Sequence, residues 1–336
     1  MKLLFLSVAT SFALACNAQN FLAMTSDDIE RWLKENNVHA LGVGIIKNGA
    51  LQPVKVYGKT CKETPAPVNT VFNVASLTKP VVATLTLRLV NTGFWSLDAP
   101  VAAYWTDPDV AEDPRAKLLT TRQLLSHQSG FTNWRWLNTD KKLAFKFDPG
   151  TKFQYSGEGY EYLRRALEQK FRLTLEQLAD SLVFRPLHMT STTFLSAGPS
   201  RPTAFCDATI STAIRQANAA DDLLTTVEDY AKFAISILKK DGLSEDLYRD
   251  MTRAHTQIKE NDFMGLGWEI LPALKDDEFA LLHTGSDTDA ATLIILLPKT
   301  KEGLVIFTNS QQGFKLYPSI ITSCLSLGNE IMSRAK

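Results

Sequence analysis

Strand signals lie at both ends of this 336-residue chain and enclose a long stretch of helical periodicity. Near the N-terminus, residues 41–46 and 51–57 flank Asn48-Gly49, and this dipeptide is the strongest short signal for a β-hairpin. Pro53 predicts an edge or a bulge in the second of these strands. Further strand signals occur at residues 266–271, 279–283, 290–297 and 303–308. Because an isolated two-stranded hairpin is only marginally stable, we expect both ends of the chain to join in one antiparallel sheet.

The stretch over about residues 76–250 is predicted to be helical. Apolar residues recur there at helical spacing, and the segments that begin at Thr174 and Thr226 have the sequence of helix N-termini. Shorter helices are expected near the two ends, one from about Thr25 and one over residues 318–327. This order predicts an α+β fold, an antiparallel sheet flanked by helices with an inserted all-helical domain.

The predicted elements divide the chain into three parts. Residues 1–18 are set apart, and residues 19–336 form one folded region. In that region a sheet domain is expected over about 25–70 and 260–336, and a helical domain over about 76–255. The cleft between two such domains is where small-molecule sites concentrate.

The first residues have the layout of a secretory signal. Lys2 supplies a positive start, an apolar run follows, and small residues surround positions 15–18, yet the run is too short to span a bilayer as a helix. Two processing outcomes remain open, cleavage after Ala18 or lipidation of Cys16. Both predict an exported protein, periplasmic or secreted, whose one membrane tether would be a lipid on Cys16.

Composition and cysteine usage exclude several classes of protein. The net charge is zero and hydrophobic residues make up 45 %, so neither a nucleic-acid-binding face nor disorder is expected. Beyond Cys16, the three cysteines Cys61, Cys206 and Cys324 are too few and too scattered for a disulfide framework. They are expected to be buried thiols or to form one incidental bridge. No motif for a metal ion or a dinucleotide is present, so no cofactor is expected.

The segment Phe72 to Pro80 carries the first chemical signal. Ser76 stands where an extended run ends and a helix begins, so free backbone N–H groups favour negative charge there. Lys79 lies three residues further on and shares a helix face with Ser76. A serine hydroxyl needs a base to become a nucleophile, and a lysine amine can serve if burial lowers its pKa.

The pattern Ser-x-x-Lys is weak evidence by itself, because both residues are common. The chain contains a second copy, Ser236-Ile237-Leu238-Lys239, inside a predicted amphipathic helix. That copy lacks a strand-to-helix junction, so we interpret Ser236 as a packing residue and Ser76 as the candidate nucleophile.

Two later segments add to this signal. Tyr155-Ser156-Gly157 lies in a Gly-rich loop before a helix, where a phenol can relay a proton, although a lone tyrosine there would as readily pack the loop. His283-Thr284-Gly285-Ser286 ends a strand in small residues that let a backbone N–H approach a substrate.

Together these segments resemble a known family. Ser76-x-x-Lys79, Tyr155-Ser156-Gly157 and His283-Thr284-Gly285 are similar, in order and spacing, to the three motifs of the serine β-lactamase and penicillin-binding-protein superfamily. The branch of class C β-lactamases, D-alanyl-D-alanine carboxypeptidases and carboxylesterases is the most similar. The segment of residues 120–130 and Phe147 to Gly150 also match, and the likeness covers nearly all of the chain after residue 25.

The resemblance implies roles for these residues. Ser76 would be the nucleophile, and Lys79 and Tyr155 would transfer protons. The N–H groups of Ser76 and Ser286 would form the oxyanion hole. His283 would stand where a lysine usually contacts the substrate. His127, in the matching segment of residues 120–130, is expected to be a packing residue of the helical domain.

Two departures from the family pattern limit the substrate. Gly157 replaces an Asn whose side chain commonly bonds a substrate amide, and His283 replaces a permanent cation. With an ordinary pKa of about 6.5, His283 is expected to be charged only part of the time near neutral pH. We therefore expect a serine hydrolase that acylates Ser76 with an ester, amide or peptide, as an esterase or D-amino-acid peptidase would.

Alternatives remain open. The chain is alternatively a β-lactamase, or a catalytically weak binding or sensor protein on the same fold. An α/β-hydrolase is excluded because no serine has the Gly-x-Ser-x-Gly pattern. Trp134 and Trp136 either line an aromatic wall of the cleft or anchor a loop. The expected partner is a small-molecule or peptide substrate.

Overall fold

The computed structural model describes residues 20–60, 63–197, 203–204 and 216–334. The predictions about the signal segment and about Cys16, Cys61 and Cys206 lie outside the described residues. Cys324 is a buried free thiol. Within the described ranges, no helix combines the length and the apolar character that crossing a membrane requires.

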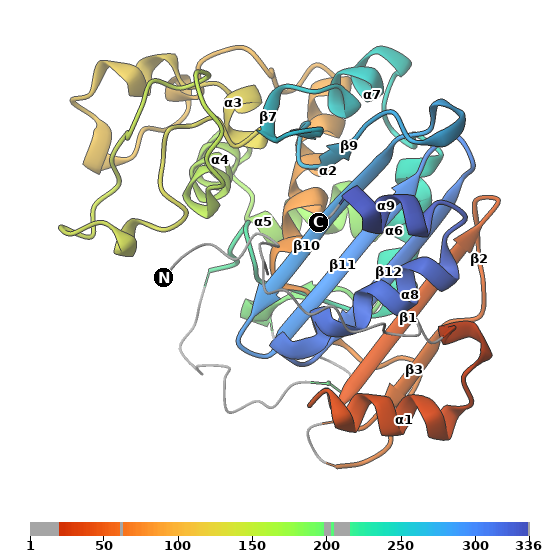
Figure 1. The fold of residues 1–336 in the computed structure, drawn as a ribbon. Coiled ribbons are helices and arrows are strands. Elements are labelled where there is room, and N and C mark those ends of the chain that lie inside the picture. The colour runs from red at the N-terminus through yellow and green to blue at the C-terminus, as the bar shows by residue number, and fades with distance from the viewer. Residues whose placement is uncertain (1–19, 61–62, 198–202, 205–215, 335–336) are drawn as a thin grey trace.

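The main sheet joins the two ends of the chain, as Figure 1 shows. Strand β1 (Ala40–Lys47) pairs antiparallel with β12 (Glu302–Thr308), with Leu41 opposite Thr308. The strand order is β2-β1-β12-β11-β10-β9-β8-β7. Strand β3 also pairs with β1, along residues 40–43, on the edge away from β12. These pairings confirm the α+β fold with an antiparallel sheet. The other strands are β2 (Ala50–Leu51), β3 (Lys55–Gly58), β7 (Thr256–Lys259), β8 (Asp262–Met264), β9 (Glu269–Leu271), β10 (Ala280–Asp287) and β11 (Ala290–Leu297).

Helices cover both faces of this sheet (Figure 1). One face packs against helices from both chain ends, and the other packs against α6 and the helical region. The continuous apolar run of β11 follows from this arrangement, because a strand buried on both faces does not alternate in polarity. The helices are α1 (Ser26–Glu35), α2 (Thr78–Asn91), α3 (Thr121–Leu125), α4 (Gly157–Phe171), α5 (Leu175–Ala179), α6 (Val227–Leu238), α7 (Glu245–Thr252), α8 (Tyr317–Cys324) and α9 (Gly328–Arg334).

Several boundaries differ from the predictions. The stretch predicted to be helical contains two short strands, β5 (Thr193–Phe194) and β6 (Leu223–Thr225), which form a small second sheet with β4 (Phe72–Asn73) just before that stretch. These strands span two or three residues each, too few for a period-2 pattern to emerge. The expected strand over residues 266–271 is shorter, because Gly267 has a left-handed φ of +83° that interrupts extended backbone.

The second sheet has a consequence for the site. Strand β4 pairs with β6, so that Phe72 lies opposite Thr225 and Asn73 opposite Leu224. The segment before Ser76 is thereby held against the segment before α6, although the two lie far apart in the chain.

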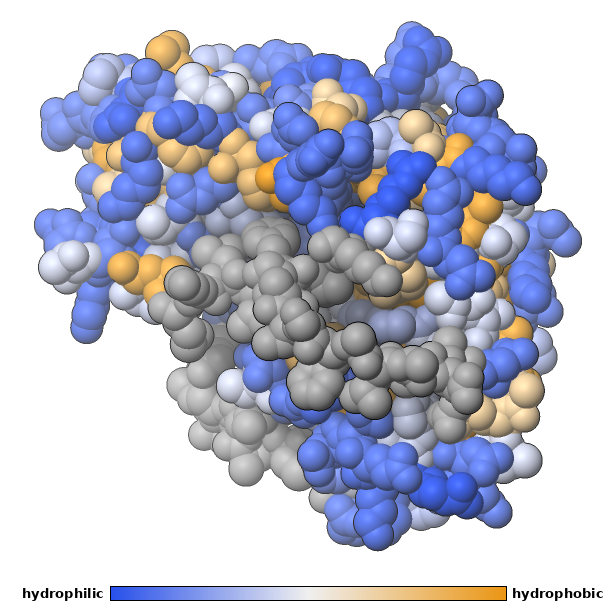
Figure 2. All heavy atoms as spheres, viewed as in Figure 1, coloured by the Kyte–Doolittle hydropathy of each residue, from blue (hydrophilic) through white to orange (hydrophobic). Residues whose placement is uncertain are grey.

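The described surface on the side of Figure 2 is mostly hydrophilic, with apolar residues in small groups between polar ones. Such a surface is expected when most large apolar residues are buried in two core clusters.

Candidate active site

Ser76 lies in a tight 3₁₀ turn, Ala75–Leu77, directly before α2. Ala75 adopts a left-handed backbone with φ of 47°, which is costly for a residue with a Cβ. Its N–H donates to the side-chain oxygen of Asn73 at 2.9 Å, and its carbonyl accepts the hydroxyl of Thr78 at 2.7 Å. These bonds hold the strained turn and present the partly exposed Ser76 at the start of the helix.

Lys79 points at Ser76. Its Nζ lies 3.0 Å from Ser76 Oγ and 2.8 Å from the carbonyl oxygen of Ala220. The side chain is 1 % exposed, and this burial lowers the pKa of Lys79 to about 7, against the opposing effect of the Asp221 carboxylate. A neutral amine is a competent base, so a large fraction of Lys79 can accept a proton near neutral pH.

Asp221 belongs to this cluster although no sequence pattern pointed to it. Burial raises the pKa of Asp221 to about 6, while the nearby Lys79 works in the other direction. The Asp221 carboxylate in turn favours the charged form of Lys79, so it partly offsets the lowering of the Lys79 pKa by burial. No spacing pattern connects two residues so far apart, so only the fold could reveal the pair.

The phenol of Tyr155 completes the arrangement. A hydrogen bond links it to the Ser76 side chain, and Lys79 Nζ lies 4.7 Å from the centre of its ring. Burial raises the pKa of Tyr155 well above its ordinary value, so the phenol keeps its proton at ordinary pH. Ser76, Lys79 and Tyr155 therefore meet in one hydrogen-bonded group.

The segment His283–Ser286, at the end of β10, lies against the turn that carries Ser76. Strand β9 pairs with β10 only from Ala280 to Leu282, and no strand among the described residues pairs with His283–Asp287 on that side. A Cβ on Gly285 would lie 2.4 Å from the carbonyl oxygen of Val74 and 3.2 Å from the nitrogen of Ser76. Only glycine permits this approach. The side chains of Thr284 and Ser286 are exposed.

His283 differs from its predicted charge state. Its Nδ1 lies 2.8 Å from the carbonyl oxygen of Thr284, and that acceptor requires the ring proton on Nδ1. The side chain is buried, and burial together with the Lys79 charge lowers the pKa of His283 to about 3. The expectation of a partly charged imidazole near neutral pH is therefore wrong, because the ring sits in a desolvated place beside a cation. His283 presents a neutral Nε2 acceptor instead.

His127, predicted to be a packing residue of the helical domain, lies in contact with the candidate proton donor. It is fully buried just after α3, with its ring centre 4.3 Å from that of Tyr155. Its Nδ1 accepts the backbone N–H of Ser156 at 3.1 Å. The only sequence signal near this contact was the family-like segment of residues 120–130, and that segment does not show which way the ring of His127 points.

The second Ser-x-x-Lys copy is a packing feature, as predicted. Ser236 is buried inside α6, and its hydroxyl donates to the carbonyl of Phe233 at 2.8 Å, a bond that satisfies it within its own helix.

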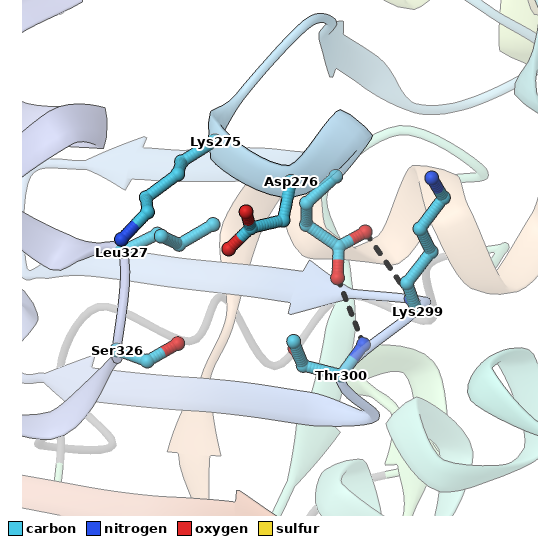
Figure 3. Close-up of a pocket in the computed structure, with 7 residues that line it drawn as sticks. Lys275, Asp276, Lys299, Thr300, Ser326 and Leu327 are labelled. Carbon is cyan, nitrogen blue, oxygen red and sulfur yellow. Dashed lines mark hydrogen bonds between the residues drawn. The ribbon is translucent and has the colours of Figure 1, made fainter.

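A separate shallow cavity lies near the start of β10 and contains none of these residues (Figure 3). Its volume is about 230 Å³. The Glu278 carboxylate beside it accepts the N–H groups of Lys299 and Thr300 at 3.1 and 2.8 Å, which fixes that turn. The described residues contain no group of three or more His, Cys, Asp or Glu placed to hold a metal ion.

Comparison with known proteins finds similarity over most of the chain. The sequence model of the Beta-lactamase family matches residues 25–320. Esterase EstB of Burkholderia gladioli is 29 % identical over 222 residues, which cover 57 % of this chain and 56 % of EstB. Protein flp of Staphylococcus aureus strain N315 is 24 % identical over 311 residues, which cover 84 % of this chain and 61 % of that protein. The chain thus spans little more than half the length of these relatives.

Among solved structures, the octameric penicillin-binding protein homologue from Pyrococcus abyssi superposes with a TM-score of 0.74. The match covers 90 % of this chain and 76 % of that one at 21 % identity. At this identity the likeness establishes the fold, and function has to be argued from the site.

Proposed function

Because the chain belongs to the β-lactamase family, we propose that it is a serine hydrolase that forms an acyl-enzyme on Ser76. The observation that carries this proposal is the 3.0 Å contact between Ser76 Oγ and the Nζ of Lys79. A nucleophile and its base at hydrogen-bond distance are the mark of covalent catalysis. The lowered pKa of Lys79, about 7, supports the role of base.

The proposed acylation begins with the neutral amine of Lys79, which takes the proton of Ser76 as Oγ attacks the substrate carbonyl carbon. The N–H groups of Ser76 and Ser286 stabilise the resulting oxyanion. When the tetrahedral intermediate collapses, the bond to the leaving group breaks and Tyr155 donates its proton to that group. The Lys79 ammonium then returns a proton to Tyr155, and water later hydrolyses the ester on Ser76.

The substrate we propose is an ester or a D-amino-acid peptide. Gly157 offers no side chain for a substrate amide, and the neutral His283 is a poor partner for a substrate carboxylate. The similarity to a protein named esterase EstB favours the ester. There are two alternatives. The protein is a β-lactamase that hydrolyses β-lactams efficiently, or it is a binding or sensor protein that acylates slowly.

A serine-reactive fluorophosphonate separates these outcomes. We expect intact-mass spectrometry to show one label on the full-length wild type, no label on Ser76→Ala and normal labelling of the matched control Ser236→Ala. Hydrolysis of short p-nitrophenyl esters without turnover of a chromogenic cephalosporin supports the esterase. The reverse pattern supports the β-lactamase. No label on the wild type, or equal labelling of Ser76→Ala, contradicts the proposal.

The export of the protein is a separate proposal that rests on residues 1–18. Cell fractionation tests it, with Cys16→Ala as the comparison. If Cys16 carries a lipid, the wild type should partition with membranes and Cys16→Ala should be found in the soluble exported fraction. Retention of both in the cytoplasm would contradict export.

A further inference from the structure

The loop of residues 132–135 is docked on the N-terminus of α4. The carbonyl of Asn133 accepts the N–H of Glu158 at 3.0 Å, and its side-chain oxygen accepts the N–H of Gly157 at 2.8 Å. The hydroxyl of Ser156 donates to the carbonyl of Thr132 at 2.9 Å. The loop therefore satisfies N–H groups that a helix leaves free at its start.

This docking places an indole where a side chain at position 157 would stand. A Cβ on Gly157 would lie 2.6 Å from Cη2 of Trp134, and two more atoms of the same six-membered ring are 2.8 Å away. Real Cβ atoms do not approach carbon so closely. Trp134 thus occupies the volume from which the usual Asn of this motif would reach a substrate.

The indole lies on the Ser76 side of the chain. Ser156 has an extended backbone, with φ of −144° and ψ of 113°, and residues on either side of an extended residue direct their Cβ atoms to the same face. Tyr155 points at Ser76, so the Cβ direction of Gly157, and with it Trp134, belongs to the same face. Trp136 stacks on Trp134 with 4.7 Å between ring centroids and is 58 % exposed.

An ion network holds this loop in place. The guanidinium of Arg135 lies 2.7 Å from Asp107, 3.0 Å from Asp109 and 2.8 Å from Glu158. Asp107 and Glu158 are almost fully buried, so these pairs are more persistent than exposed ones. These ion pairs hold the residue next to Trp134 in the chain, so they fix the position of the loop that carries the indole.

We infer that Trp134 sets the substrate class of the Ser76 site by giving it an apolar wall next to Tyr155. The site takes esters with an aliphatic or aromatic acyl group and discriminates against acylamino compounds. This inference rests on the proposed hydrolase activity. A substrate amide placed against the indole loses its water without gaining a hydrogen bond, and an unpaired polar group of this kind costs about tenfold or more in rate.

The test compares two p-nitrophenyl esters of equal chain length, the pentanoate and the N-acetylglycinate, which differ by an amide. The ratio of kcat/KM for the pentanoate to kcat/KM for the N-acetylglycinate is measured for the wild type, Trp134→Ala and Trp134→Leu. The two esters differ in intrinsic reactivity, and dividing the ratio of each variant by that of the wild type cancels this difference. We expect the preference for the pentanoate to fall by about tenfold in Trp134→Ala and by less in Trp134→Leu. The double variant Trp134→Ala/Gly157→Asn, which restores an amide side chain, should lower it further.

Trp32→Ala is the matched control, because this partly buried tryptophan of α1 packs on Phe21 at the other core and should leave the ratio unchanged. A ratio within about twofold of the wild type in both Trp134 variants would overturn the inference. Hydrolysis of p-nitrophenyl acetate by the wild type and its loss in Ser76→Ala report on the hydrolase itself. Absence of that hydrolysis would remove the proposed function, whereas its presence with an unchanged ratio would remove only the role of Trp134.

Discussion

The ring of His127 lies 4.3 Å from the ring of Tyr155, centre to centre, and accepts the N–H of the next residue, Ser156, at 3.1 Å. An acceptor at Nδ1 requires the proton of the neutral ring on Nε2. Burial and the Lys79 charge lower the pKa of His127 well below its ordinary value, so the ring stays neutral. His127 is therefore placed to position the phenol of Tyr155.

This relationship predicts different results for two substitutions of His127. Asn tolerates its left-handed φ of 55° and supplies an acceptor near the Ser156 N–H, so His127→Asn should keep part of the labelling rate. His127→Leu keeps apolar bulk without an acceptor and should label about tenfold more slowly or worse, because one misplaced group is enough to slow catalysis strongly. The rate of fluorophosphonate labelling checks this, with thermal melting to establish folding. Equal rates in two folded variants would contradict a positioning role.

The pH dependence of acylation should follow Lys79. Its pKa is about 7 and the neutral amine is the base, so the labelling rate should rise with pH through that value and then level off. Asp221 raises the pKa of Lys79, so Asp221→Asn should move the rising limb to lower pH. The limb is measured from pH 5 to 9, with Asp246→Asn on the exposed side of α7 as the control. A limb that stays in place, or that moves to higher pH, would show that another group is the base.

His283 should contribute no limb of its own near neutral pH. Its pKa of about 3 leaves it neutral over that whole range. His283→Gln keeps a neutral polar group, so it should change the level of kcat/KM while the shape of its pH profile between pH 5 and 8 stays the same. A wild-type limb near the ordinary pKa of histidine, about 6.5, that disappears in His283→Gln would restore the cationic role.

A carboxyl pair in the β8–β9 hairpin predicts a pH-dependent stability. Asp262 and Glu269 share a hydrogen bond, and burial raises the pKa of Glu269 well above its usual range. A carboxyl with a raised folded pKa is most favourable at low pH, and that contribution is lost as pH rises toward the folded pKa. Glu269→Gln removes this loss. We therefore expect it to raise the melting temperature by roughly 2–4 °C at pH 8 and to leave it unchanged at pH 4.

Melting curves of the wild type and Glu269→Gln at the two pH values decide this prediction. The exposed Glu228→Gln serves as the control, since its pair with Lys232 lies at the surface of α6. A gain at pH 4 equal to that at pH 8 would point to packing in place of proton linkage.

The sequence by itself determined the fold class and the family. The apolar runs of β11 and β12, together with the Asn48-Gly49 turn, predicted that the two chain ends form one sheet, because local polarity records which residues must be buried. Short strands such as β5 and β7 escaped prediction, since a few residues carry too little periodicity.

Only the tertiary structure decided the chemistry around Ser76. The pKa of Lys79, the neutrality of His283 and the presence of Asp221 depend on burial and on charges supplied by distant segments. The same holds for Trp134, whose position beside Gly157 follows from the docking of one loop on α4. The type of a residue determines which proton its side chain can transfer. Desolvation and the charges that folding brings near it determine its pKa, and so whether that transfer can occur at neutral pH.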